Sequence, residues 1–146
     1  RASELNSVST IYQIGLRGVG SGRQQEYDDA NTYGSNLISA YEVHDIGIKA
    51  ILEKIPDDVN FYITVDADGM DPTIMPAVNA PTPGGLNWLQ IRELIHGIVK
   101  KGRVLGFDLV EISPSFEKGN TTLVHAERLI CNFIGAMVRA GYYDSK

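Results

Sequence analysis

The sequence predicts a doubly wound α/β domain, a mostly parallel β-sheet with helices on both faces. Two observations favour this fold class. Segments with strand and helix patterns alternate along the 146 residues, as they do when right-handed crossovers connect parallel strands. Residues 103–112 are almost continuously apolar, which is typical of a parallel strand that helices cover on both sides. The length and the ordinary globular composition indicate one domain, residues 1–146.

The first half of the chain contains two strand patterns and two helix patterns. Residues 11–17 are rich in β-branched and aromatic side chains and precede a cluster of glycines, so they predict a strand followed by a turn. Residues 24–34 are polar and accommodate a short helix, and residues 36–39 predict a weak second strand. A stripe of isoleucine and leucine side chains then predicts a helix over residues 43–55.

A strand pattern at residues 61–66 continues the alternation and leads into a long irregular passage over residues 67–86. Loops of this length in compact domains are usually functional or disordered, and the four prolines here favour a fixed path.

Helix and strand patterns complete the chain. Asn87 and Gln90 match a capping box, which predicts a helix that begins there and ends at Lys101. The apolar strand over residues 103–112 follows, and apolar side chains at helical spacing predict a last, core helix over residues 122–142.

Three closely spaced carboxylates, Asp66, Asp68 and Asp71, stand where the strand at residues 61–66 ends. Successive strand side chains point to opposite faces, so Asp66 and Asp68 project the same way if the strand continues that far. Two parallel carboxylates repel each other unless positive charge compensates them, and carboxylate oxygens are favoured ligands of Mn²⁺ and Mg²⁺. The local pattern leaves two interpretations open, a divalent metal site and an Asp-rich turn.

Glu111 stands at the C-terminal edge of the strand over residues 103–112. In open α/β sheets ligands bind at the carboxyl ends of the strands, and this rule gathers Asp66, Asp68 and Glu111 on one edge. Asp108 lies deeper in the same strand and is expected to pair with a backbone or basic group.

The other polar or reactive side chains have ordinary structural interpretations. Arg17 is interpreted as a solvated arginine, and Cys131, inside the last helix pattern, as a buried structural thiol. A single cysteine excludes an internal disulfide framework. His44 is expected to be a surface or capping histidine, because no His, Cys or acidic residue lies at a recognisable metal-ligand spacing around it. His96 is expected to be structural or solvent-facing, and His125, one turn inside the last helix, can face the loops but shows no sign of a catalytic role.

Charge and hydropathy limit the partners. A net charge of −5 argues against nucleic acid and permits a cationic substrate. No apolar run approaches the roughly 18 residues needed to span a bilayer, and the N-terminal segment lacks a signal-peptide pattern. We therefore expect a soluble, cytoplasmic protein without a membrane partner.

The segment from Val65 to Pro72 resembles the signature of the arginase and agmatinase (ureohydrolase) family, and residues 75–77 and 83–86 extend the likeness. Residues 13–18, residues 108–111 and the final amphipathic helix follow in the family's order, so the resemblance covers most of the chain. Within the family the similarity is greatest to agmatinase and guanidinobutyrase-like enzymes. These enzymes hydrolyse a guanidino compound to an amine and urea with two Mn²⁺ ions that share a hydroxide.

The resemblance implies roles for individual residues. Asp66 is similar to the carboxylate that bridges both metals, Asp68 to one that binds a single metal, and Glu111 to the acid that holds the guanidinium. Asp71 matches an Asp-Pro step that shapes the loop. The chemistry agrees, because a two-metal site lowers the pKa of a bridging water and a planar cation favours a carboxylate opposite it. The implied partners are a small cationic guanidino substrate and further copies of the chain, since the family tends to form trimers and hexamers.

The sequence departs from the family in the other metal ligands. These come from upstream Gly-Asp-His and Asp-x-His-x-Asp segments, and neither occurs here. The chain, which starts at Arg1 without a methionine, is therefore expected to be the C-terminal half of an arginase-like fold and to be inactive alone. The family's general-acid histidine is also missing, so no catalytic residue is assigned. A non-catalytic fragment or assembly unit and a different α/β metal-binding domain remain as alternatives.

Overall fold

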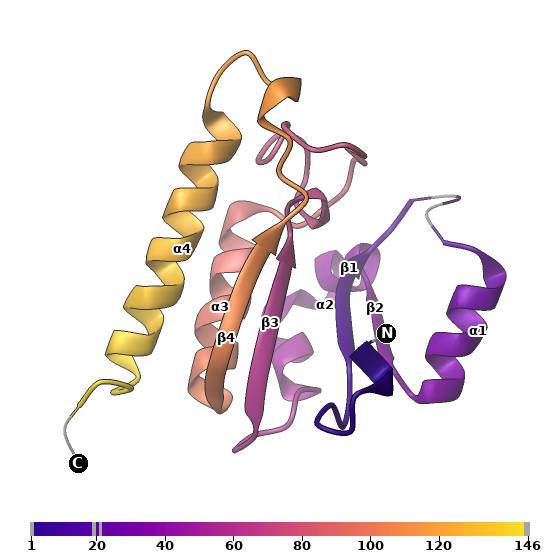
Figure 1. Cartoon of the computed structure of the whole chain (residues 1–146), viewed down its shortest axis with the longest axis vertical. Coiled ribbons are helices and arrows are strands. Elements are labelled where there is room, and N and C mark those ends of the chain that lie inside the picture. Colours follow the sequence, from indigo (N-terminus) through magenta and orange to yellow (C-terminus); the bar gives the residue numbers. More distant parts are fainter. Residues whose placement is uncertain (1, 19, 21, 145–146) are drawn as a thin grey trace.

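The computed structural model describes residues 2–18, 20 and 22–144, and every predicted strand and helix is present in it (Figure 1). The elements in chain order are η1 (Ala2–Glu4), β1 (Tyr12–Leu16), α1 (Gln24–Tyr33), β2 (Asn36–Ser39), α2 (Ala40–Glu53), β3 (Asn60–Asp66), η2 (Ala67–Gly69), α3 (Trp88–Lys101), β4 (Arg103–Val110), η3 (Pro114–Phe116) and α4 (Thr121–Arg139), where η marks a short 3-10 helix.

The strands form two parallel pairs. In the described part of the chain β1 pairs with β2 and β3 pairs with β4, and each pair is a separate two-stranded sheet. The strands of both pairs run in the same direction (Figure 1). Helix α2 connects the pairs, because it packs on β1 and β2 and also on α3. The predicted α/β class with parallel strands is confirmed.

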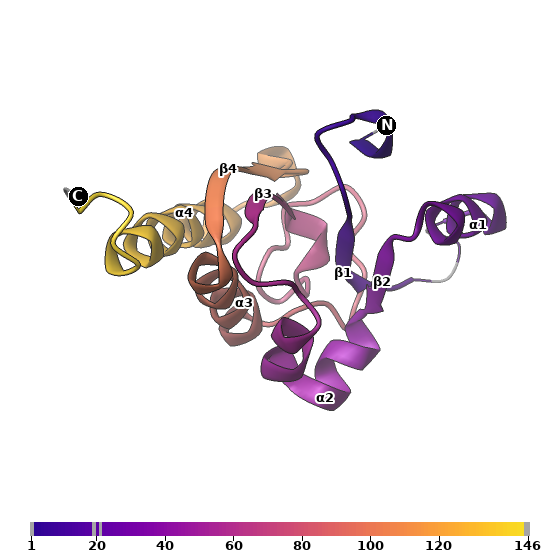
Figure 2. The ribbon, with the colours of Figure 1, turned by 90° about the horizontal axis from the view of Figure 1, so that it is seen from below.

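The long helices α2, α3 and α4 lie on the same side of the strands (Figure 2). Side chains on that side make the core: Val65 of β3 is buried, and the ring of Phe107 in β4 stacks on Phe133 of α4 with centroids 4.2 Å apart. On the opposite face of β3, Tyr62 is 68% exposed. The core therefore lies between the strands and these helices, and the loops after β1, β3 and β4 gather at one end of it (Figure 1).

Side-chain caps set the start of two helices. Helix α3 begins as predicted, with the reciprocal bonds of a capping box between Asn87 and Gln90. Helix α2 begins at Ala40, earlier than predicted, because the hydroxyl of Ser39 accepts a hydrogen bond from the backbone N–H of Glu42 at 3.1 Å. The Ser-x-x-Glu spacing is itself a capping signal in the sequence.

Helix α4 is amphipathic, with one buried stripe and one exposed apolar stripe. The buried stripe includes Leu129 and Phe133, whereas Ile130 and Ile134 are 40% and 48% exposed. Cys131 is exposed as well, so the prediction of a buried thiol is wrong. Helical periodicity identified the helix but did not identify which of several adjacent apolar positions face the core. No helix in the described segments is long and apolar enough to cross a membrane.

Candidate metal site

The carboxylates of Asp66 and Asp68 come together through a turn and not through strand alternation. Strand β3 ends at Asp66, and residues Ala67–Gly69 form the 3-10 helix η2. Oδ1 of Asp66 accepts a hydrogen bond from the backbone N–H of Asp68 at 3.0 Å, so Asp66 caps this turn. The strand ends at Asp66, as predicted, so the condition under which strand alternation would point Asp66 and Asp68 the same way is not met. The two residues instead share one turn at the C-terminal end of the strand.

The surroundings of Asp66 disfavour its charged form. Partial burial of the carboxyl group raises its pKa, the Asp68 N–H bond lowers it, and the nearby Asp68 carboxylate raises it again. The positive charge of Arg17 acts in the lowering direction as the weakest of these effects. A divalent cation beside both carboxylates would compensate this repulsion, so the two residues suit a hard metal ion that prefers oxygen ligands.

Arg17, one residue beyond the end of β1, holds this turn from the neighbouring strand pair. Its Nη2 donates to the backbone carbonyl oxygens of Asp68 at 2.7 Å, Met70 at 3.0 Å and Thr82 at 2.6 Å. Its Nε also donates to Thr82, at 3.1 Å. The prediction of a solvated arginine is therefore wrong. Backbone carbonyl partners leave no trace in side-chain patterns, which is why the sequence did not reveal them.

Asp71 closes the long loop. Its Oδ1 accepts from the backbone N–H and the hydroxyl of Thr73 at 3.0 and 2.6 Å, and its Oδ2 accepts from the backbone N–H of Gly84 at 2.9 Å. Next to this contact the backbone of Gly85 lies so close to Met70 that an added Cβ would stand 2.4 Å from the Met70 carbonyl carbon. The interpretation of Asp71 as a loop-shaping residue is confirmed.

Acid should weaken this closure. The bonds to Thr73 and Gly84 lower the pKa of Asp71 to about 2, below its ordinary value of 3.8. The stabilisation is therefore present above about pH 4 and is lost as the pH falls towards 2. At about pH 5 we expect the wild type to unfold at a higher urea concentration than the Asp71→Asn variant. At about pH 2 the difference between their unfolding midpoints should shrink. A difference that is unchanged at the lower pH would contradict this account.

His44 is exposed, as predicted, but it also contacts the C-terminal end of the long loop. Its Nε2 lies 3.3 and 3.1 Å from the carbonyl oxygens of Gly84 and Gly85, and its Nδ1 lies 3.2 Å from Nε2 of Gln90. Because Gln90 belongs to the α3 capping box, His44 joins α2, the loop and the start of α3.

His96 and His125 have structural contacts, as predicted. His96 Nε2 lies 3.2 Å from Oδ1 of Asn132, across the interface of α3 and α4. His125 donates from Nδ1 to the carbonyl oxygen of Ile74 at 2.7 Å, and its ring lies 5.6 Å from that of Trp88. His96 thus links two helices, whereas His125 links α4 to the long loop.

Glu111 follows directly on β4 in a left-handed backbone conformation, with φ of 60°. Its neighbours are tied to the loop, because Ile112 forms an antiparallel bridge with Val78 and the N–H of Ser113 donates to Ala77 at 2.8 Å. A non-glycine residue in this conformation costs of order 1 kcal/mol or more, and such strain occurs preferentially at functional sites. β4 lies beside β3, so Glu111, directly after β4, and Asp66, the last residue of β3, lie at the same edge, as the sequence predicted.

Asp108 faces away from the helices. Its Oδ2 accepts a hydrogen bond from the hydroxyl of Tyr62 at 2.9 Å, and its Oδ1 is buried without a partner among the described residues. The acidic group raises the pKa of the Tyr62 phenol. The prediction that Asp108 pairs with a backbone or basic group is therefore wrong, because its partner is the phenol of Tyr62 on the adjacent strand.

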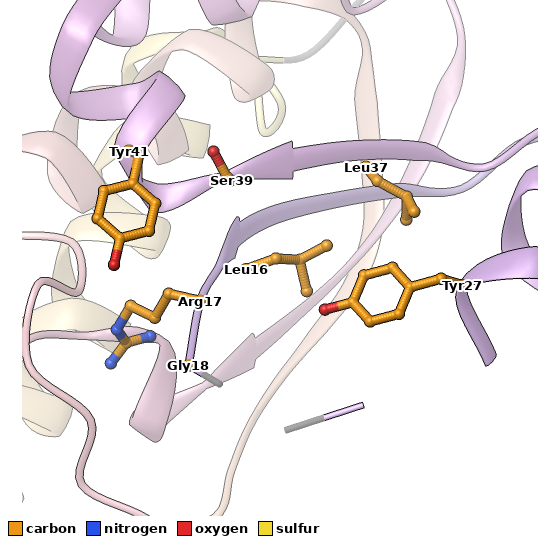
Figure 3. Close-up of a pocket in the computed structure, with 7 residues that line it drawn as sticks. All are labelled: Leu16, Arg17, Gly18, Tyr27, Leu37, Ser39 and Tyr41. Carbon is orange, nitrogen blue, oxygen red and sulfur yellow. The ribbon is translucent and has the colours of Figure 1, made fainter. Parts of the chain in front are cut away.

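A pocket of about 310 Å³ lies at the end of the other strand pair (Figure 3). Leu16, Leu37 and Tyr27 give it an apolar wall, and Arg17 and Tyr41 stand at its other side. Asp66, Asp68 and Glu111 do not line it, so the pocket and the carboxylates are neighbouring features that share only Arg17.

The carboxylates alone supply only part of a metal centre. Their oxygens fit Mn²⁺ or Mg²⁺, but no group of three or more His, Cys, Asp or Glu side chains suited to a metal occurs within residues 2–18, 20 and 22–144. Within the described residues, Asp66 and Asp68 therefore offer two carboxylates and not a complete set of ligands.

The chain is similar to known proteins over most of its length. The model of the Arginase family matches residues 1–135. Putative agmatinase 3 of Schizosaccharomyces pombe is 32% identical over 117 residues, which are 78% of this chain and 28% of that protein.

Solved structures show the same correspondence. The agmatine ureohydrolase of Thermoplasma volcanium matches with a TM-score of 0.77 and 33% identity, over 93% of this chain and 44% of that one. The proclavaminate amidino hydrolase of Streptomyces clavuligerus matches with a TM-score of 0.80 and 28% identity, over 88% of this chain and 43% of that one. The chain thus spans less than half the length of each of these relatives.

Proposed function

Because the chain belongs to the arginase family, we propose that the protein carrying it is a ureohydrolase that cleaves a small cationic guanidino compound to an amine and urea. One observation carries the proposal: Asp66 and Asp68 share a turn at the end of β3, and Glu111 directly follows the adjacent strand β4 in a strained conformation. Two carboxylates for a metal and a third for a guanidinium are the groups that this reaction needs at one sheet edge.

Each residue has a defined task in this proposal. Asp66 would help to hold two Mn²⁺ ions and Asp68 one of them, and the chemistry that such a centre would supply is the activation of water at neutral pH. Glu111 holds the planar guanidinium by charge-assisted hydrogen bonds and so orients the carbon that is attacked. Asp71 keeps the loop in the shape that presents these groups.

The substrate is proposed to be of the agmatine or guanidinobutyrate type. The likeness to proteins named agmatinase and agmatine ureohydrolase supports this choice. The similar fold of a proclavaminate amidino hydrolase indicates that the parts that recognise the rest of the substrate vary within one scaffold.

We further propose that residues 1–146 are one α/β domain that forms part of a longer cytoplasmic, oligomeric ureohydrolase. The exposed apolar stripe of α4, which includes Ile130 and Ile134, supports a covering partner segment or subunit.

The isolated chain of 146 residues is expected to bind Mn²⁺ weakly and to release no urea. Two carboxylates leave most coordination positions to water, so neither the geometry of an ion nor the pKa of its water ligand is set. Urea would be assayed with Mn²⁺ and agmatine or guanidinobutyrate, both for this chain and for the full-length protein that carries it. Urea release by the full-length protein alone is the expected result.

Two other outcomes would change the proposal. Metal-dependent urea release by the isolated chain at an enzymatic rate would show that its own residues complete the site. Absence of urea release by the full-length protein with either substrate would favour a non-catalytic fragment or assembly unit.

A further inference from the structure

The guanidinium of Arg17 is surrounded by backbone carbonyl oxygens. Besides the bonds to Asp68, Met70 and Thr82, Nη1 lies 3.4 Å from the carbonyl oxygens of Gly15 and Gly69. A guanidinium presents its donors in a rigid planar fork, so several acceptors can be held in one fixed arrangement. A lysine ammonium has the same charge but cannot reproduce that geometry.

Three of these acceptors belong to consecutive residues, Asp68, Gly69 and Met70. Their peptide groups form the segment from which the Asp68 side chain projects, so Arg17 fixes the direction in which that carboxylate leaves the backbone. Asp66 is fixed indirectly, because its Oδ1 accepts from the N–H of the same Asp68. Both carboxylates are thus oriented by one side chain that comes from the other strand pair.

We propose that Arg17 is a positioning residue that orients Asp66 and Asp68 for metal coordination without touching the metal or the substrate. This inference rests on the proposed function for the assignment of those two carboxylates as metal ligands. Outer groups that orient metal ligands typically contribute tenfold to a hundredfold to metal affinity.

A purely structural role is the competing explanation, because Arg17 also bonds Thr82 and thereby closes the long loop. His44 is a matched control for it. His44 holds the same loop through the carbonyl oxygens of Gly84 and Gly85, and none of its hydrogen bonds in the described part of the chain reaches the turn that carries Asp68. Loss of either residue should loosen the loop, and only loss of Arg17 should disturb the carboxylates.

The experiment compares Arg17→Lys, Arg17→Gln and His44→Ala in the full-length protein that carries this chain. Mn²⁺ dissociation constants would be measured by electron paramagnetic resonance, and thermal midpoints by circular dichroism. We expect both Arg17 variants to bind Mn²⁺ about 10- to 100-fold more weakly and His44→Ala to stay within about threefold of the wild type, although its midpoint falls. The KM for the guanidino substrate at saturating Mn²⁺ should not change.

Arg17 variants that lose thermal stability but keep the wild-type Mn²⁺ affinity would overturn the proposal and leave a structural role. If neither Arg17 variant folds, the proposal is tested by hydrogen exchange of the Arg17 Nε–H in the wild type, with and without Mg²⁺. Exchange should slow when Mg²⁺ binds, and an unchanged exchange rate would overturn the proposal. Failure of the wild type itself to bind Mn²⁺ would instead remove the metal assignment of Asp66 and Asp68, and the inference with it.

Discussion

Asp68→Asn in the full-length protein is expected to lose most of its bound Mn²⁺ and to lower kcat by about 100-fold or more. The amide keeps the shape of the side chain but removes the charge that offsets the metal, and even outer partners of metal ligands reach losses of this size. Metal content after dialysis and urea release at increasing Mn²⁺ concentrations are the measurements.

Asp71→Asn is the matched control for that substitution, because it makes the same chemical change three residues further along the same loop. Asp71 bonds Thr73 and Gly84, so its replacement should reduce stability while Mn²⁺ occupancy persists. If Asp68→Asn kept both its metal and its turnover, Asp68 would have to be removed from the site.

Glu111→Gln is expected to lower kcat/KM for guanidino substrates by about 10- to 100-fold while Mn²⁺ occupancy stays unchanged. A charge-assisted hydrogen bond to a guanidinium contributes about 1.5–3 kcal/mol, and each 1.36 kcal/mol corresponds to a factor of ten. Steady-state kinetics together with metal analysis would separate the two effects.

The backbone of Glu111 offers a second variant. Asparagine adopts the left-handed conformation more readily than glutamate, and φ here is 60°. Glu111→Asn should therefore keep or slightly raise the thermal midpoint while it loses activity on guanidino substrates. A variant that lost its metal and kept its affinity for a guanidine would show that Glu111 had been assigned the wrong role.

Local sequence signals located the elements of the fold well. The Asn87 and Gln90 spacing marked the first turn of α3 because a capping box consists of contacts within four neighbouring residues. The same kind of signal at Ser39 was overlooked, which displaced the start of α2. The width of the buried stripe on a helix is not a local signal, since it depends on which elements pack against that helix. The prediction that Cys131 is buried was wrong for that reason.

The sequence predicted that Asp66 and Glu111 lie at one sheet edge, but it did not predict the local geometry there. Parallel strands that end at one edge were enough to group Asp66 with Glu111. A turn joins Asp66 to Asp68 directly after the strand, because an aspartate side chain can accept a hydrogen bond from the backbone N–H two residues on. Arg17 was missed, since its partners are carbonyl oxygens 51 to 65 residues away and any residue can supply one.

The division of the described strands into two parallel pairs has a consequence for cooperativity. Helices α2, α3 and α4 supply most of the largest fully buried side chains, whereas α1 buries none, and the β1–β2 pair is attached to the rest through α2 and Arg17. Units with few buried contacts open at lower free energy than the rest of a molecule. Such a partial opening would withdraw the guanidinium from the turn after β3 while β3 and β4 stay paired, so the two carboxylates would lose their alignment before the fold itself is lost.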